Sequence, residues 1–121
     1  MNADLGGNAL ATICEGNKVV AYDRELSKIL GYTGAMGVIG HEVGHHLCGH
    51  LHYDSGIREE LEADAISGAV MKNAGYSIDD ALKMVRIFSM RETVSHPDAA
   101  SRASAIASGW MNPEAAKSAC K

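Results

Sequence analysis

Several features that mark other classes of protein are missing from this chain of 121 residues. No apolar run approaches the roughly 20 residues that a membrane-spanning helix requires. No cluster of Lys or Arg offers a surface for nucleic acid or anionic lipid, and the formal net charge of −4 also disfavours such partners. We therefore expect no membrane span and no bound nucleic acid, and a protein or peptide as the partner.

Cysteine and aromatic residues are few. The three cysteines, Cys14, Cys48 and Cys120, lack the CxxC spacing of a structural zinc site or a redox motif, and their odd number leaves at least one thiol unpaired within a monomer. Because free cysteine behaves as a small hydrophobe, we expect Cys48 to be buried rather than to bind a metal. Aromatic residues make up only 5% of the chain, whereas 13 glycines allow helices to pack closely.

The length and composition fit one globular domain over residues 1–121. The first residues carry no signal-peptide pattern and lead almost directly into the first expected strand. We therefore expect a domain excised from a longer precursor. Its location stays open between a bacterial cell envelope or secretion, if a signal or anchor was removed, and the cytoplasm otherwise.

Hydrophobic periodicity predicts a mostly helical α+β fold with about four helices and a small β-hairpin at the edge. The segments NALATIC and KVVAY form the hairpin, on either side of the turn Glu15-Gly16-Asn17. A short helix ending at Gly31 precedes the main ones. These are expected at about residues 34–50, 56–73, 77–91 and 99–109, with a short turn from Asn112.

The segment GHEVGHHLCGHLH, residues 40–52, contains the most specific motif of the chain. His41, Glu42 and His45 form HExxH, whose four-residue spacing brings both histidines to one face of a helix. Imidazole nitrogen binds zinc readily, and a catalytic site needs three protein ligands with a fourth position open for water. Glu42 can reach that water as a general base. The motif predicts one catalytic zinc ion.

Three glycines share a face of the same predicted helix. Gly37, Gly40 and Gly44 fall at i, i+3 and i+7. Each glycine weakens an isolated helix by up to about 1 kcal/mol, so tertiary packing must hold this helix. Another element is expected to approach closely there.

The next predicted helix offers acidic candidates for the third ligand, in the segment REELEADA. Glu60 and Asp64 are four residues apart and share a face, so Glu60 can bind the metal while Asp64 orients a ligand histidine. Glu59 and Glu62 point elsewhere, and we expect them on a solvated helix face.

A metzincin pattern, HExxHxxGxxH, fits this stretch less well. Its glycine position holds Cys48 and its third histidine position holds Leu51. A displacement of one residue turns a helical side chain by about 100°. We therefore expect the other histidines of the stretch to be exposed or hydrogen-bonded rather than ligands; they are His46, His50 and His52.

The order of three motifs resembles the HtpX and CAAX-prenyl-protease family of gluzincin metallopeptidases. They are HExxH at residues 41–45, ExxxD at residues 60–64, and the loop residues Ser95-His96-Pro97 followed by Arg102. The resemblance covers most of the chain, which is similar in size to the compact members called minigluzincins.

This resemblance implies a zincin-like metallopeptidase core. It implies that His96 faces the metal, as an oxyanion donor or as a gate on the open position, with Arg102 nearby. It also places an edge strand beside the motif helix, here the hairpin of residues 9–22, where a substrate strand can add. The remaining assignments are zinc held by His41, His45 and Glu60, Glu42 as the base, and Asp64 supporting the ligands.

The expected function is zinc-dependent endopeptidase activity. One alternative is a latent or non-catalytic zinc-binding module with an interaction or chaperone-like role. Another is an HExxH hydrolase that acts on a non-protein substrate or on one dedicated regulator. A structural zinc is closed by four protein ligands, so the first alternative gains if His96 or Cys48 fills the fourth position.

Overall fold

A computed structural model describes residues 9–23, 25–50, 56–91 and 97–119 of the chain. Helices dominate these ranges, beside one two-stranded antiparallel sheet. The predicted mostly helical α+β class is confirmed at this coarse level. The elements are β1 (Ala9–Cys14), β2 (Asn17–Tyr22), α1 (Leu26–Leu47), α2 (Ile57–Asn73), α3 (Ile78–Leu82), α4 (Met84–Arg91), α5 (Ala99–Met111) and α6 (Pro113–Ala119).

The number of helices was underestimated from the sequence, because six occur within the described ranges. The single helix predicted over 77–91 is divided at Lys83 into α3 and α4. Lys83 keeps right-handed helical dihedrals, so the apolar periodicity continues across the break and does not reveal it. None of the helices in the described ranges is both long enough and apolar enough to cross a bilayer.

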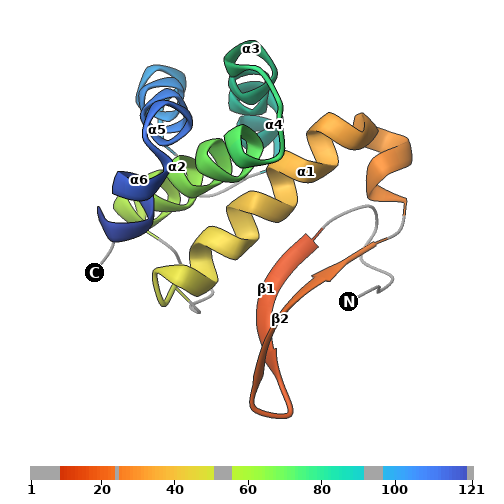
Figure 1. The fold of residues 1–121 in the computed structure, drawn as a ribbon. Coiled ribbons are helices and arrows are strands. Elements are labelled where there is room, and N and C mark those ends of the chain that lie inside the picture. The colour runs from red at the N-terminus through yellow and green to blue at the C-terminus, as the bar shows by residue number, and fades with distance from the viewer. Residues whose placement is uncertain (1–8, 24, 51–55, 92–96, 120–121) are drawn as a thin grey trace.

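The hairpin packs beside α1 (Figure 1). Glu15 and Gly16 connect the strands with φ values of 52° and 81°, the positive φ at both central positions that a type I′ turn requires. His46 on α1 donates a hydrogen bond from Nε2 to the backbone carbonyl of Val19 on β2. The hairpin is thereby bonded to the helix that carries the HExxH motif.

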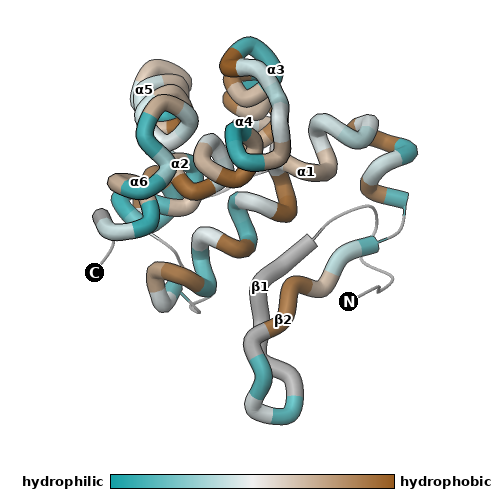
Figure 2. Tube along the Cα trace, in the orientation of Figure 1, coloured by the Kyte–Doolittle hydropathy of each residue, from teal (hydrophilic) through white to brown (hydrophobic). Residues whose placement is uncertain are grey.

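Helix α2 lies at the centre of the helical part. In Figure 1, α1 crosses one side of α2 while α5 and α6 lie on the other side, and α3 and α4 cover one end. Apolar and polar segments alternate along α1 and α2 in Figure 2, as expected for helices with one face in a core. Fully buried members of this core are Val38, Met71, Met84, Phe88 and Ile106.

The predicted glycine face of α1 is where α2 approaches most closely. A Cβ added to Gly44 would lie 2.8 Å from the Cα of Ala63, and one added to Gly40 would lie 3.2 Å from the Cα of Ser67. Side chains at these positions would push the two helices apart. The contact brings the HExxH segment of α1 against the first turns of α2, where Glu60 and Asp64 lie.

Helix α1 is interrupted near its start and ends earlier than predicted. Gly31 has φ 75° and ψ 171°, which separates a short first segment from the main helix, as the sequence indicated. The main helix was expected to reach His50 but ends at Leu47, because Gly49 adopts φ 75° and turns the chain. His50 therefore lies outside the helix.

Helix α5 contacts α2 at a point where no side chain fits. A Cβ on Gly109 would lie 1.8 Å from the carbonyl oxygen of Ala65. We expect Gly109→Ala to lower the free energy of unfolding by at least about 1–3 kcal/mol, the usual cost of overpacking a core. Urea unfolding measures this value. Ser104→Ala on the exposed side of the same helix is the control and should change stability by less than about 0.5 kcal/mol. Equal stability of both variants would contradict this packing.

Candidate metal centre

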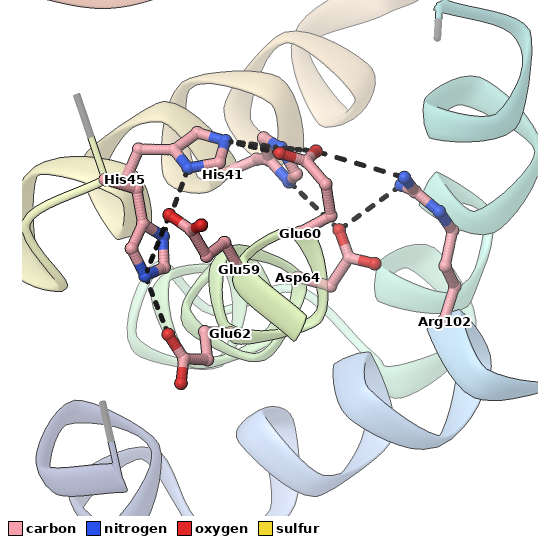
Figure 3. A network of polar contacts seen from close by, with 8 residues as sticks. His41, His45, Glu59, Glu60, Glu62, Asp64 and Arg102 are labelled. Atoms are coloured by element: carbon pink, nitrogen blue, oxygen red, sulfur yellow. Dashed lines mark hydrogen bonds and ion pairs between the residues drawn. The ribbon is translucent and has the colours of Figure 1, made fainter. Parts of the chain in front are cut away.

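Three helices contribute the polar cluster at the α1–α2 contact (Figure 3). His41 and His45 lie one turn apart on α1 and face Glu60 of α2. Arg102 enters from α5 on the far side. Every one of these side chains is buried, although they are polar or charged. Residues far apart in the sequence are thus brought together at the place that the motif analysis predicted.

The two histidines and Glu60 form a triangle of residues that brings four donor atoms together. The Nε2 atoms of His41 and His45 are 3.1 Å apart. Glu60 places Oε1 3.1 Å from the first nitrogen and Oε2 3.2 Å from the second. Tetrahedral zinc with bonds of about 2.0–2.1 Å has neighbouring ligand atoms about 3.3 Å apart. Each of these three separations is therefore close to that between neighbouring zinc ligands, although each histidine nitrogen faces a different oxygen of Glu60.

Glu42 lies beside the same donor atoms. One of its carboxylate oxygens and a ring nitrogen of each of His41 and His45 all lie within 4.8 Å of one another. Glu42 is buried, with only 8% of the residue exposed. This position is suitable for a group that exchanges a proton with a water bound next to the histidines.

Asp64 contacts the ring nitrogen of His41 that does not face Glu60, and Arg102 in turn contacts Asp64. His41 donates from Nδ1 to Asp64 Oδ1 at 2.9 Å, which leaves Nε2 to face Glu60 and His45. Arg102 donates from Nη1 to the same Asp64 oxygen at 3.3 Å, and its Nη2 lies 4.0 Å from Glu60 Oε1. One guanidinium group thus lies next to both carboxylates.

Acidic side chains outnumber basic ones among the described residues of the cluster. Among the described residues that line it, Glu42, Glu60 and Asp64 carry three formal negative charges, and Arg102 carries one positive charge. Carboxylates buried close together repel one another, which favours a cation near them. The acidic character of the donor set therefore suits a divalent cation such as Zn²⁺, in agreement with its spacing.

In the metal-free protein, a proton on His41 compensates part of this charge. Burial by itself would lower the pKa of His41. Hydrogen bonds to Asp64 and Glu60, together with the charges of Asp64 and Glu42, outweigh burial and raise the pKa from 6.5 to about 9. A metal that binds Nε2 must displace this proton.

The two acidic residues expected on a solvated helix face, Glu59 and Glu62, both lie near His50. Glu62 was expected on a solvated face, but it accepts a hydrogen bond from Nε2 of His50 at 2.7 Å and its side chain is only 18% exposed. Glu59 is partly exposed, with one oxygen 4.0 Å from the same nitrogen. His46 and His50 are buried and hydrogen-bonded, in agreement with the prediction. A turn formed after α1 brings His50 to Glu62, and the helical spacing used for the prediction does not describe that turn.

Some predicted site residues cannot be placed. His52 and His96 lie outside the described residues, so the predicted role of His96 stays a prediction. Cys48 was expected to be a buried free thiol. It packs against the small apolar cluster of Ile66, Ala69 and Ala116, but it is only partly buried and is bonded in a disulfide. The count of cysteines alone does not reveal which of them pair.

A cavity of about 410 Å³ lies elsewhere, near the first half of α1. Tyr22, Tyr32, Met36, Ile39 and Tyr76 are among its lining residues. None of the donor residues of the triangle lines it. The buried polar cluster and this apolar cavity are therefore separate features.

Comparison with known proteins finds no matching family model, curated protein or solved structure. The residues of the cluster and their geometry are the grounds on which a function can be proposed.

The raised pKa of His41 predicts how the metal-free protein responds to pH. A group whose pKa is higher in the folded state stabilises the fold fully below its unfolded value, and this stabilisation is lost as the pH rises through the folded value. The free energy of unfolding with chelator present should therefore fall as the pH rises from about 6.5 to about 9.

Urea titrations in a chelating buffer measure this dependence. His41→Gln is the control, since its difference from wild type isolates the contribution of the imidazole. The assigned proton would be contradicted if the wild type became more stable relative to His41→Gln as the pH rises.

Proposed function

We propose that this chain is a zinc-dependent endopeptidase of the gluzincin kind, with one zinc ion held by His41, His45 and Glu60. The observation that supports it most is the close approach of the two histidine nitrogens to each other and of one Glu60 oxygen to each of them, at 3.1 to 3.2 Å. A zincin-like core and membership of the HtpX and CAAX-prenyl-protease family belong to the same proposal. The motif order in the sequence supports them.

An open fourth position is part of the proposal. Cys48 is in a disulfide and offers no thiolate to the metal. His50 is hydrogen-bonded to Glu62 and contacts His45 through Nδ1, on the ring side away from the triangle. Three protein ligands with room for water are the arrangement of catalytic zinc, whereas structural zinc has four. The described residues thus favour a catalytic centre.

The protein groups have distinct tasks in peptide hydrolysis. When bound, zinc supplies a Lewis acid that lowers the pKa of a coordinated water to about 7. Glu42 would act as the general base and would then return the proton to the leaving amine. Asp64 accepts the Nδ1 proton of His41 and so keeps Nε2 directed at the metal. Arg102 stabilises the carboxylates of Asp64 and Glu60 through its guanidinium group.

The hairpin is the proposed substrate-binding edge. It packs against the motif helix, and the bond from His46 to Val19 fixes β2 to that helix. An extended peptide can add to a strand edge through backbone hydrogen bonds, which place few demands on its sequence. We propose unfolded or flexible segments of proteins as the substrate class, and His96 as a residue that faces the open position.

Removing the third ligand should abolish tight zinc binding. Glu60→Gln loses the carboxylate that spans both histidine nitrogens. Its zinc affinity should fall by more than the roughly 100-fold that loss of a supporting residue costs. Glu59→Gln, one position away on the same helix, should bind zinc nearly as wild type does. Competition with a chromophoric chelator measures both. Unchanged affinity in Glu60→Gln would move the third ligand to Glu59 or Glu62.

Removing the base should abolish turnover while zinc stays bound. Glu42→Gln keeps the size of the side chain but cannot take up the proton. Its rate of casein cleavage should fall by about 10²–10⁴-fold, with zinc content near one per chain. Wild-type protein purified in parallel is the reference. Cleavage by Glu42→Gln at the wild-type rate would exclude Glu42 as the base, and no cleavage by zinc-loaded wild type would favour the latent module.

A further inference from the structure

The chain turns sharply after the motif helix and brings His50 next to His45. The His50 N–H donates to the carbonyl of His45 at 2.7 Å, and the Gly49 N–H donates to that of His46 at 3.3 Å. These two bonds and the φ of 75° at Gly49 define a Schellman motif. In this motif the second residue beyond the helix commonly contacts the residue five positions earlier. Here that pair is His50 and His45.

The two imidazoles meet through their Nδ1 atoms, which are 3.3 Å apart. Only one of the two nitrogens can carry the proton in such a contact. If His45 binds a metal through Nε2, its own proton is on Nδ1. His50 Nδ1 is then the acceptor, and His50 carries its proton on Nε2.

Glu62 stabilises the same arrangement by contacting the other ring nitrogen of His50. The Nε2 of His50 lies 2.7 Å from Glu62 Oε1, so a proton on that nitrogen is donated to a carboxylate. Arg58 pairs with the other oxygen of Glu62 at 3.3 Å. His50 is buried, at 8% exposure, and both of its ring nitrogens have a partner. Its tautomer and its ring orientation are therefore determined.

We propose that His50 is a positioning residue for the metal ligand His45. Its Nδ1 accepts the Nδ1 proton of His45 and holds the Nε2 of His45 toward zinc, while Glu62 holds His50. This inference rests on the proposed metal centre. It gives the second ligand a support that matches the one Asp64 gives His41, with a histidine inserted between the ligand and the carboxylate.

A second metal site is the competing explanation for the same residues. Ligand atoms of Cys48, His50 and Glu62 lie within 4.8 Å of one another. Cys48 is in a disulfide, however, and a metal needs the thiolate. The direct bond between His50 and Glu62 is also shorter than two ligands of one zinc ion would allow, which is about 3.3 Å. Support of His45 accounts for these contacts better.

Two substitutions test the roles of the two ring nitrogens of His50 separately. The side-chain amide of Asn reaches the position of Nδ1, and that of Gln reaches the position of Nε2. His50→Asn therefore keeps an acceptor for His45 and loses the contact with Glu62, whereas His50→Gln does the reverse. Because the two variants differ by one methylene, they provide matched controls for each other.

The experiment measures zinc affinity of the full chain by chelator competition, and the visible spectrum of the cobalt-substituted protein. We expect His50→Gln to bind zinc about 10–100-fold more weakly than wild type and to show an altered cobalt spectrum. His50→Asn should stay within a few-fold of wild type with an unchanged spectrum. Glu62→Leu, which leaves His50 in place, should weaken zinc binding less than His50→Gln does.

Several outcomes would overturn the inference. They are equal losses in the Asn and Gln variants, a greater loss in His50→Asn, or wild-type affinity in all three. If wild type binds no zinc, both this inference and the proposed function fail. If wild type binds zinc but cleaves nothing, only the proposed activity fails, because the affinity and the cobalt spectrum still report on His45. If His50→Gln does not fold, the zinc affinity of Glu62→Leu relative to wild type tests the inference instead.

Discussion

The close approach of α1 to α2 is the constraint on which the rest of the molecule depends. Gly40 and Gly44 present no side chains at the crossing, so the backbone of α2 lies against α1 at van der Waals distance. Only at this separation can the carboxylate of Glu60 reach the nitrogens of both His41 and His45. Packing of small residues thus sets the separation of the donor atoms in the candidate metal centre, and a larger side chain at the crossing would move His41 and His45 away from Glu60.

Buried charge is the second constraint, and it explains why α5 takes part. Two carboxylates of α2 lie in a low-dielectric interior where uncompensated charge is costly. Arg102 on α5 pairs with Asp64 and approaches Glu60, and its side chain is fully buried. A divalent metal would add positive charge beside these carboxylates. Folding of this region and binding of a metal are therefore expected to be coupled.

The sequence predicted the parts of this arrangement that depend on helical spacing. His41 with His45 and Glu60 with Asp64 are each four residues apart, and a helix converts that spacing into a shared face. The turn after α1 and the disulfide at Cys48 were not predicted. Gly49 ends α1 early and carries His50 back to His45, and the disulfide at Cys48 has no signature in a count of three cysteines. The break at Lys83 was not predicted because apolar periodicity continues through it.

Zinc-edge X-ray absorption of the zinc-loaded protein tests the central claim most directly, since it reports the ligands without requiring a substrate. We expect four nitrogen or oxygen neighbours at about 2.0–2.1 Å, with outer-shell scattering from two imidazoles and no sulfur. Substitution of His41 or His45 should remove one imidazole from that signal. A sulfur neighbour at about 2.3 Å, or a spectrum without two imidazoles, would contradict a site built from His41, His45 and Glu60.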